Sequence, residues 1–577
     1  MPSEERSKFR EEFPELFRAD DKYYGKLISD SEATKYMKDD KQKPYYVLDG
    51  MINGDEKSEY ARKSEHLVFW FTKDLRTADN VGLHEAYQLA AEHGKRLVTI
   101  YILEIGDVES HFISPWQLQF IFDNVQKLKE ELNRFNIPLY FKVIGQPKEH
   151  KVSYSKKNYA TLNCIKEFMG MLNCHVIFKS MEYELDEIRR DIKLISSSKF
   201  KVLVYKNSLV SNPMDITTKK GTIPGIFSPF YKNWMKYVEK KFSKKTDIIL
   251  LENIVKERQE GEFPTAGEFD YTRDLPTLES VEDRYRPLRS ICLDELQLSF
   301  YKSHYTIGEK EALNYLSHYA EGPILKYNTK DNLSSFDSFG NAGASSRISH
   351  YMALGILGAN TVVNVVLKKQ VKSMTISIEK INQSAFDFLR EIAFRDYYKH
   401  VSVHWPHLAM NKPFHFYDIK WSYDSTNFKK WVSGKTGFPI VDAGMRQLKS
   451  EGYIPNRVRM IVATFLAKDL LIDWKAGELY FLLNLIDGDF SSNNGGWGWC
   501  TSTGIDAQPY FRVFNPYLQS ERFDPEGNYI RKYVPELKDL KGKSIHNPIN
   551  ALRYYPPVVN HSQAAKRAIE DFREAIY

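Results

Sequence analysis

Cysteine is scarce in this chain of 577 residues, and the four that occur, at positions 164, 174, 292 and 500, are widely spaced. No Cys-x-x-Cys pair is present, which argues against a zinc ribbon or a disulfide framework and favours a reducing compartment. Long uncharged apolar runs are also absent, and the mean hydropathy is −0.48. No membrane association is therefore expected.

A strong excess of charge is missing too. The 81 basic and 75 acidic residues leave a net charge of +6, which permits a polyanionic partner without demonstrating one. The first residues lack an apolar core, so they do not form a secretory signal, and their acids make a poor mitochondrial presequence. The predicted location is the nucleus, with the mitochondrion as an additional compartment.

Periodicity divides the chain into four parts. Residues 1–64 are charged and aperiodic, which predicts a flexible or partly helical extension. Residues 65–205 alternate apolar strands with helical segments, which predicts a doubly wound parallel-sheet α/β domain. The expected strands are 66–71, 96–103, 137–143, 176–179 and 201–205.

Residues 206–305 contain several prolines and little periodicity, which predicts a long irregular connector. From 306 to 577 the pattern is mostly helical, as in 386–394 and 458–474, and predicts an all-α domain. The turn after the first strand, 72–80, has no Gly-x-Gly-x-x-Gly, so any dinucleotide is expected elsewhere.

Five ordered motifs carry a family resemblance. They are Trp70-Phe-Thr-Lys-Asp-Leu-Arg76, Gly343-Ala-Ser-Ser-Arg-Ile-Ser349, Gly437-Phe-Pro-Ile-Val-Asp-Ala-Gly-Met-Arg446, Asn456-Arg-Val-Arg-Met460, and the stretch from Asp487 through Trp499 that continues to Arg512. Together they resemble the DNA photolyase and cryptochrome family over residues 66–575. The resemblance implies an antenna-binding α/β domain and a helical domain that binds FAD without a covalent bond.

The serine-rich turn also has a reading from its residues alone. Hydroxyls before a helical segment can hold a pyrophosphate, although an N-cap cluster is the commoner use of such residues. The resemblance favours FAD contacts, with Arg459 balancing Asp487. The implied cofactor residues are Tyr327, Ser345, Ser346, Arg347, Ile348, Ser349, Arg459, Asp487, Gly488, Asp489 and Asn493.

Asn493 stands where the family places a side chain facing the flavin N5. Photolyases resemble each other in having Asn there, whereas cryptochromes often carry Asp or Cys. A neutral amide can accept a hydrogen bond from N5–H, which is how a protein tunes such a cofactor. Trp421, Trp474 and Trp497 match the family's electron-transfer chain, with an inferred role in photoreduction; any one of them alone would be read as core.

The substrate side resembles that of enzymes repairing cyclobutane pyrimidine dimers in DNA. Glu391 is expected to stabilise the base radical anion and Met460 to pack between the bases of a dimer flipped into the pocket. A (6-4) photolyase would be expected to carry His near 456–460. The implied DNA-binding residues are Glu391, Phe394, Arg395, Asn456, Arg457, Met460, Trp499 and Gln519.

Phe394 departs from the family, in which many members have a lesion-stacking Trp. A base stacked on an aromatic ring gains roughly 1–3 kcal/mol, and Phe offers the smaller face. A second chromophore is also implied: His111, Asp186 and Glu187 match contacts to 5,10-methenyltetrahydrofolate, although Asp186 stands where Asn is familiar. A deazaflavin or no antenna stays open.

His400, His404 and His407 have a spacing that suggests a metal, but no paired acid accompanies them, and no metal is expected. The sequence thus predicts a monomeric, light-dependent lyase acting on dimer-containing DNA. The alternative is a cryptochrome-like blue-light receptor, which Asn493, Glu391 and Met460 disfavour. A damage-binding module without turnover is suggested only by Phe394.

Overall fold

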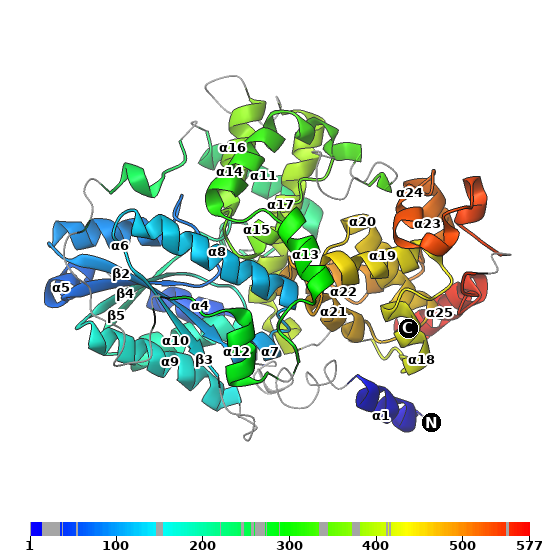
Figure 1. Ribbon diagram of the computed structural model, residues 1–577, viewed down its shortest axis with the longest axis horizontal. Helices are drawn as coiled ribbons and strands as arrows, with labels where there is room; N and C mark the ends of the chain where they lie inside the picture. Colours follow the sequence, from blue (N-terminus) through cyan, green and yellow to red (C-terminus); the bar gives the residue numbers. More distant parts are fainter. Residues whose placement is uncertain are drawn as a thin grey trace.

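The computed structural model describes most of the chain in detail. The described residues are 2–13, 35–36, 39–52, 56–145, 154–219, 221–243, 247–255, 259, 272, 274–287, 289–329, 331–333, 344–371, 381–410, 414, 417–549 and 553–576. The α/β part and the helical part lie side by side, and both termini lie on the helical side (Figure 1).

Five parallel strands form one sheet in the order β3-β2-β1-β4-β5. They are β1 (His66–Phe71), β2 (Arg96–Glu104), β3 (Leu139–Ile144), β4 (Val176–Ser180) and β5 (Lys201–Tyr205). All six residues of the central strand β1 are buried. The predicted doubly wound parallel sheet is confirmed, with strand ends displaced by two residues at most.

Successive side chains of β1 alternate between the two faces of the sheet and pack in the core on each face. Leu67, Phe69 and Phe71 pack with α6 (Val81–Glu92) and α8 (Pro115–Asn133). Val68 and Trp70 join a second core on the opposite face. Because neighbouring side chains on a strand point to opposite faces, a continuous apolar run is required when helices cover both. The helices of the second face are α9 (Tyr154–Met171) and α10 (Leu185–Ser197).

The described parts of the N-terminal extension are helical and packed. Helix α4 (Pro44–Met51) buries Tyr45 and Leu48 against α10, and α5 (Lys57–Lys63) packs on the sheet domain. Helix α1 (Pro2–Glu12) lies instead on the helical domain, where the Phe9 ring centroid is 5.0 Å from that of Phe428.

The connector of 206–305 is more ordered than its sequence predicted. It contains α11 (Phe227–Lys241), α12 (Leu278–Tyr285) and α13 (Glu295–His304). Phe227, Phe230, Trp234 and Val238 repeat at helical spacing and are buried, which explains α11. Pro229 lies in its first turn, where the missing N–H is tolerated, so the proline does not break the helix.

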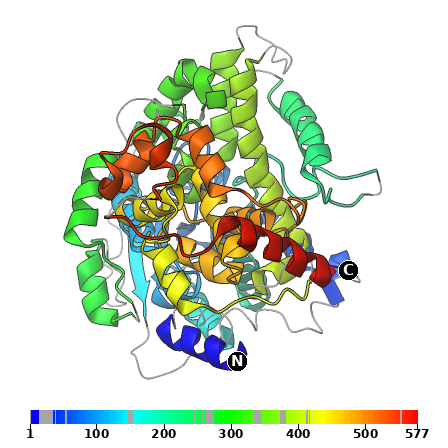
Figure 2. The same ribbon diagram turned by 90° about the vertical axis from the view of Figure 1, so that its right-hand side faces the viewer.

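The helical domain holds the longest helix, α17 (Gln383–His404), against α11 and against α22 (Phe490–Thr501). In Figure 2 the C-terminal helix α25 (His561–Ile576) crosses in front of this domain. The remaining helices include α14 (Glu309–Glu321), α15 (Ser349–Ala353), α16 (Ala359–Gln370), α18 (Ser425–Val432), α19 (Pro439–Glu451), α23 (Pro516–Phe523) and α24 (Asn528–Tyr533).

One predicted helical stretch, 458–474, is interrupted. Helix α20 (Asn456–Thr464) continues into the π-helical turn η9 (Phe465–Asp469), and α21 (Trp474–Leu482) starts anew. Leu471 has a φ of +53°, a left-handed conformation that a continuing helix does not allow. The prediction of one continuous helix was wrong because apolar periodicity does not report such a residue.

Candidate functional site

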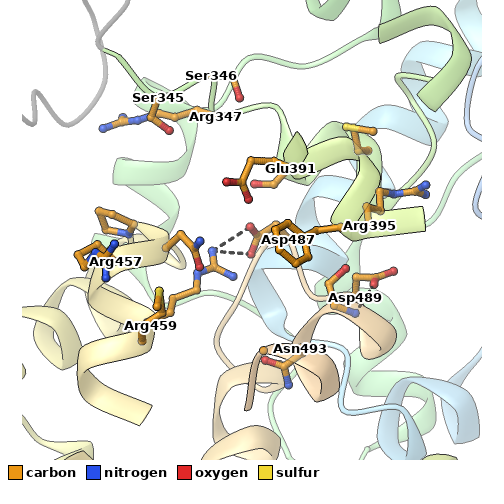
Figure 3. Close-up of a pocket in the computed structure, with 18 of the residues that line it drawn as sticks. Ser345, Ser346, Arg347, Glu391, Arg395, Arg457, Arg459, Asp487, Asp489 and Asn493 are labelled. Carbon is orange, nitrogen blue, oxygen red and sulfur yellow. Dashed lines mark hydrogen bonds and ion pairs between the residues drawn. The ribbon is translucent and has the colours of Figure 1, made fainter. Parts of the chain in front are cut away.

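The large cavity, of about 780 Å³, opens between α17, α20, α22 and the turn before α15. Its size is typical of a cofactor or ligand site. Figure 3 shows side chains from these four segments converging on it. The predicted cofactor residues that line it are Tyr327, Ser345, Ser346, Arg347, Ile348, Ser349, Arg459, Asp487, Asp489 and Asn493.

The serine-rich turn forms one wall of the large cavity. Arg347 has a φ of +47°, and helix α15 begins at Ser349. Within the described part of the chain, the hydroxyls of Ser345, Ser346 and Ser349 make no hydrogen bond to another residue, although all three line the cavity. The turn therefore presents hydroxyl donors to a ligand, and its serine side chains do not cap helix α15.

Arg459 and Asp487 form an ion pair in the wall of the large cavity. The Nη2 atom of Arg459 lies 2.8 and 3.1 Å from the two carboxylate oxygens (Figure 3). Burial opposes the charge of Arg459, but Asp487 more than offsets this and raises the guanidinium pKa. The pair is the one expected from the sequence, and it leaves this wall close to neutral.

Asn493 is held by the backbone below it. Its Nδ2 donates to the carbonyl oxygen of Glu478 at 3.0 Å, and the neighbouring Asn494 donates to the Glu478 carboxylate at 2.9 Å. This bond engages one of the two N–H groups of Nδ2, and no described residue donates to the amide oxygen of Asn493, which is therefore available to a ligand. Burial raises the pKa of Glu478 to about 7, so this carboxyl is largely protonated below neutrality.

The residues expected to contact DNA lie on the other side of the same cavity. Glu391, Phe394, Arg395, Asn456, Arg457, Met460 and Trp499 all line it. Gln519 of α23 is not among the lining residues, because α23 packs against α19. Its part in binding DNA stays a prediction that the geometry does not favour.

Two of these side chains are fixed by partners that the sequence did not predict. Arg457 donates to a carboxylate oxygen of Asp331 from Nη2 at 2.7 Å and lies 4.4 Å from the Phe523 ring centroid. Phe394 stacks face to face on Phe227 of α11, with ring centroids 3.5 Å apart and an interplanar angle of 6°. The connector thus supports the wall of the cavity.

The three tryptophans of the expected electron path belong to one apolar cluster. Trp497 lines the large cavity, Trp474 is buried at the start of α21, and Trp421 is half-buried against the same cluster. The ring of Trp421 also meets Phe572 of α25 edge-on at 5.8 Å. The three tryptophans therefore extend from the cavity wall to a half-buried position beside α25, and their role as an electron path stays a prediction.

A small cavity, of about 160 Å³, lies between the α/β domain and the helical domain. The predicted antenna residues His111, Asp186 and Glu187 line it, and His111 Nε2 is 3.0 Å from Asp186 Oδ2. Burial raises the pKa of Glu187, and its buried Oε2 accepts no hydrogen bond from a described residue. Such an oxygen is suited to a ligand N–H donor.

Gly488 was predicted among the cofactor contacts of the large cavity, but it lines the small cavity instead. Its carbonyl oxygen accepts from Gln117 Nε2 at 2.8 Å, and this contact from α8 pulls the backbone toward the α/β domain. Adjacent Asp489 lines both cavities. The Asp487–Asp489 segment is therefore the partition between them.

Two family models match the chain: "DNA photolyase" over residues 67–247 and "FAD binding domain of DNA photolyase" over residues 388–574. A deoxyribodipyrimidine photo-lyase of Neurospora crassa is 34% identical, over 96% of this chain and 89% of that protein. The mitochondrial deoxyribodipyrimidine photo-lyase of Saccharomyces cerevisiae is 33% identical, over 98% of this chain and 96% of that protein.

The chain belongs to the DNA photolyase family.

A solved structure extends the comparison to the fold. A bacterial class III photolyase from Agrobacterium tumefaciens superposes with a TM-score of 0.71 at 27% identity, covering 89% of this chain and 98% of that one. The two domains of this photolyase therefore follow the family arrangement, and the helical domain is its FAD-binding domain.

The histidines that suggested a metal serve other purposes in this photolyase. His400 Nε2 lies 2.8 Å from the carbonyl oxygen of Ser211, and His404 Nδ1 lies 3.2 Å from the Tyr46 hydroxyl. His407 lies outside α17, in the 3-10 turn η8 (Pro406–Met410). Among the described residues, no group of three or more His, Cys, Asp or Glu side chains is placed to bind a metal. No described helix is both long and apolar enough to span a bilayer.

Sequence reasoning missed several residues that shape the two cavities of this photolyase. Tyr453 lines the large cavity beneath the guanidinium groups of Arg347 and Arg459, at 5.9 and 5.4 Å. Lys399 bridges to Asp489. The signal for Lys399 was available, since Glu391, Arg395 and Lys399 recur every four residues and so share one face of α17.

Proposed function

We propose that this photolyase repairs cyclobutane pyrimidine dimers in DNA, using light and reduced FAD. The observation that carries the proposal is that one cavity joins two sets of side chains. Asn493, Arg459 and the serine-rich turn supply a cofactor side, and Glu391 and Met460 supply a substrate side. A dimer and a flavin in this cavity would lie next to each other.

The cofactor side matches FAD in its donor chemistry. The hydroxyls of Ser345, Ser346 and Ser349, with Arg347, are suited to the diphosphate. The Asp487–Arg459 pair supplies both acceptors and donors for the polar ring edges. When bound, reduced FAD supplies the light-excited electron that splits the cyclobutane ring and then returns.

Asn493 holds its amide in one orientation for the flavin ring. The bond from Nδ2 to the Glu478 carbonyl aims the amide oxygen away from the helix, so it can accept from N5–H without taking the proton. Trp497, Trp474 and Trp421 would pass electrons inward from an external reductant to FAD that has become oxidised. They take no part in ring opening, because that step returns its electron.

The substrate side positions the flipped dimer. Glu391 donates or accepts a hydrogen bond at the base carbonyl that gains charge, and Met460 packs between the two bases. Arg457, fixed by Asp331 and Phe523, and Asn456 bind the flanking backbone and base. Phe394 and Trp499 provide aromatic walls that exclude water from the dimer.

For the small cavity we propose 5,10-methenyltetrahydrofolate as the antenna. Glu104, Glu182, Glu184, Asp186 and Glu187 line this cavity. Although Lys73 and Arg190 also line it, the excess of carboxylates suits a pterin-like ring with N–H donors and disfavours the phosphates of a deazaflavin or a flavin nucleotide. The buried Oε2 of Glu187 is the acceptor best placed for such a donor.

We propose that the protein works in the nucleus and in the mitochondrion, the compartments that hold eukaryotic DNA. The mitochondrial name of the S. cerevisiae relative supports the second compartment. Imaging the full chain with a C-terminal fluorescent tag beside organelle markers tests this. A tag found in neither compartment would reject the assignment.

The test of the main proposal is repair of a defined oligonucleotide containing one thymine dimer. The purified, reduced protein is expected to split the dimer into two thymines under blue light and not in the dark. Binding of the damaged oligonucleotide without light-dependent repair would reject the enzyme and favour a damage-binding or signalling protein. Glu391→Gln is expected to lower the repair yield several-fold while FAD binding is kept.

A further inference from the structure

Lys399 is a buried cation placed between the two cavities. It is 4% exposed and lies on α17, two turns after Glu391. Its Nζ is 2.6 Å from Asp489 Oδ2 and also forms an ion pair with Glu184. Lys399 does not line either cavity, so it can affect a ligand in them only through these two carboxylates.

The two carboxylates differ in the cavities that they line. Asp489 lines both, whereas Glu184 lines only the small one. Lys73 Nζ then lies 3.8 Å from Glu184 and 3.7 Å from Glu187. Alternating charges therefore run without a break from Glu187, the proposed antenna acceptor, to Asp489 at the flavin cavity.

Asp489 connects this series to the flavin side through helix α22. Its Oδ1 accepts from the backbone N–H of Ser492 at 2.9 Å and so caps the helix. The next residue of the helix is Asn493, which faces the flavin cavity. The orientation of Asp489 therefore sets the first turn of the helix that carries the flavin contact.

The bridge depends strongly on Lys399. Burial alone would raise the pKa of Asp489, but Lys399 and Arg395 more than offset burial and hold it well below its usual range. The pKa of Glu184 is likewise lowered, burial being outweighed by Lys399 and Lys73. Removing Lys399 would take the shared cation away from two largely buried carboxylates and leave Glu184 with only the more distant Lys73, which destabilises their present orientations.

We propose that Lys399 is a positioning residue shared by both cavities, through which occupancy of the small cavity strengthens FAD binding in the large one. The inference rests on the proposed function, because it takes FAD and a second chromophore as the two ligands. By linkage, FAD must strengthen binding in the small cavity by the same factor.

The first test compares FAD dissociation constants with and without saturating 5,10-methenyltetrahydrofolate. In the wild type, folate is expected to tighten FAD binding at least about 5-fold. Lys399→Met should bring the ratio of the FAD dissociation constants without and with folate close to one. Lys399→Arg, which can still bridge two carboxylates, should largely keep the wild-type ratio. An equal ratio in the wild type and Lys399→Met, or a ratio of one in the folate-loaded wild type, would overturn the proposal.

A matched control is available in Lys43. It is also 4% exposed and pairs with one carboxylate, Asp40, at 2.5 Å, but it lines neither of the two cavities. Lys43→Met should leave the ratio unchanged, which separates coupling from loss of any buried lysine. If Lys399→Met does not fold, Glu184→Gln cuts one arm of the bridge and should also reduce the ratio.

The second test needs no folate. Hydrogen exchange of residues 182–190 is measured with and without FAD, and FAD is expected to slow it in the wild type and in Lys43→Met but not in Lys399→Met. Unchanged exchange in the wild type would overturn the coupling. Failure of the wild type to bind FAD would reject the proposed function instead, and failure to bind folate would reject only the antenna assignment, leaving exchange to decide the coupling.

Discussion

The two cavities of this photolyase differ in charge as much as in size. The large one, about 780 Å³, is lined by serine hydroxyls and by five arginines and five carboxylates, whereas in the small one, about 160 Å³, carboxylates outnumber the cations Lys73 and Arg190. They share a wall at Asp489. The two adjacent sites therefore differ in charge balance: the large one is close to balanced, and the small one carries an excess of acidic side chains.

Each of the two sites has a buried carboxyl with a raised pKa, and the two carboxyls differ in their hydrogen-bond partners. Glu478 is 2% exposed and its Oε1 accepts from Asn494 Nδ2, so the protein itself supplies a donor to this carboxyl. Glu187 keeps an Oε2 that no described residue satisfies. The first is part of the floor beneath the flavin side, and the second is suited to a ligand.

The largest effect is expected from Arg459→Ala. The change leaves Asp487 buried without its partner, and breaking such a pair costs about 3–5 kcal/mol. The dissociation constant of FAD should rise at least about 100-fold, measured by flavin fluorescence. Arg457→Ala, two residues away but paired with Asp331, should weaken dimer binding and leave FAD affinity nearly unchanged; equal loss of FAD in both variants would contradict the separation of the two sides.

Glu478→Gln should change the pH dependence of stability. The folded pKa of about 7 exceeds the unfolded value, so the stability from this group is full below about pH 4.5 and is lost as pH rises through 7. The variant lacks this loss, and its unfolding free energy relative to wild type should increase by about 3 kcal/mol between about pH 4.5 and pH 8. Urea unfolding at several pH values measures this, and a difference independent of pH would show that folding does not shift the pKa of Glu478.

Glu187→Gln makes the same chemical change in the small cavity with a different result. Loss of the charged acceptor should weaken folate binding about 10-fold, as expected for a hydrogen bond to a charged group. FAD affinity measured without folate should stay the same. Absorbance titration follows both ligands, and Glu478→Gln serves as the control because it should not weaken folate binding. Unchanged folate affinity would remove Glu187 from the antenna site.

The smallest effect is expected from Phe394→Trp at the mouth of the large cavity. A larger face should tighten binding of dimer-containing DNA several-fold, in line with roughly 1 kcal/mol of additional stacking. The affinities for FAD and for folate should not change. Unchanged or weaker binding in a gel-shift titration would mean that Phe227, which already covers one face of Phe394, leaves no use for the larger ring.

The sequence predicted the sheet well because every strand of a doubly covered sheet is a short apolar run, as in 66–71 and 201–205. It also named residues that the large cavity brings together, among them Asn493, Glu391 and Met460, and the Arg459–Asp487 pair. It did not predict α11, which begins between Pro224 and Pro229, nor the break at Leu471, which depends on one backbone angle.

Residues that act by bridging were the hardest to find. Lys399, Asp331 and Phe227 contact partners that are distant in the chain, and each alone resembles a surface charge or a core ring. The position of Gly488 also depends on a tertiary contact. Its neighbours in sequence line the large cavity, whereas Gly488 itself, which accepts a hydrogen bond from Gln117, lines the small cavity. Only tertiary contacts separate such cases.

The most direct test of the account is single-turnover repair. The reduced protein, loaded with FAD and bound to an oligonucleotide with one thymine dimer, receives a series of short blue-light flashes. The account predicts that dimers disappear with each flash up to one per protein, with the flavin returned to its reduced form and no loss in darkness. Flashes that bleach or oxidise the flavin while the bound dimer persists would contradict it.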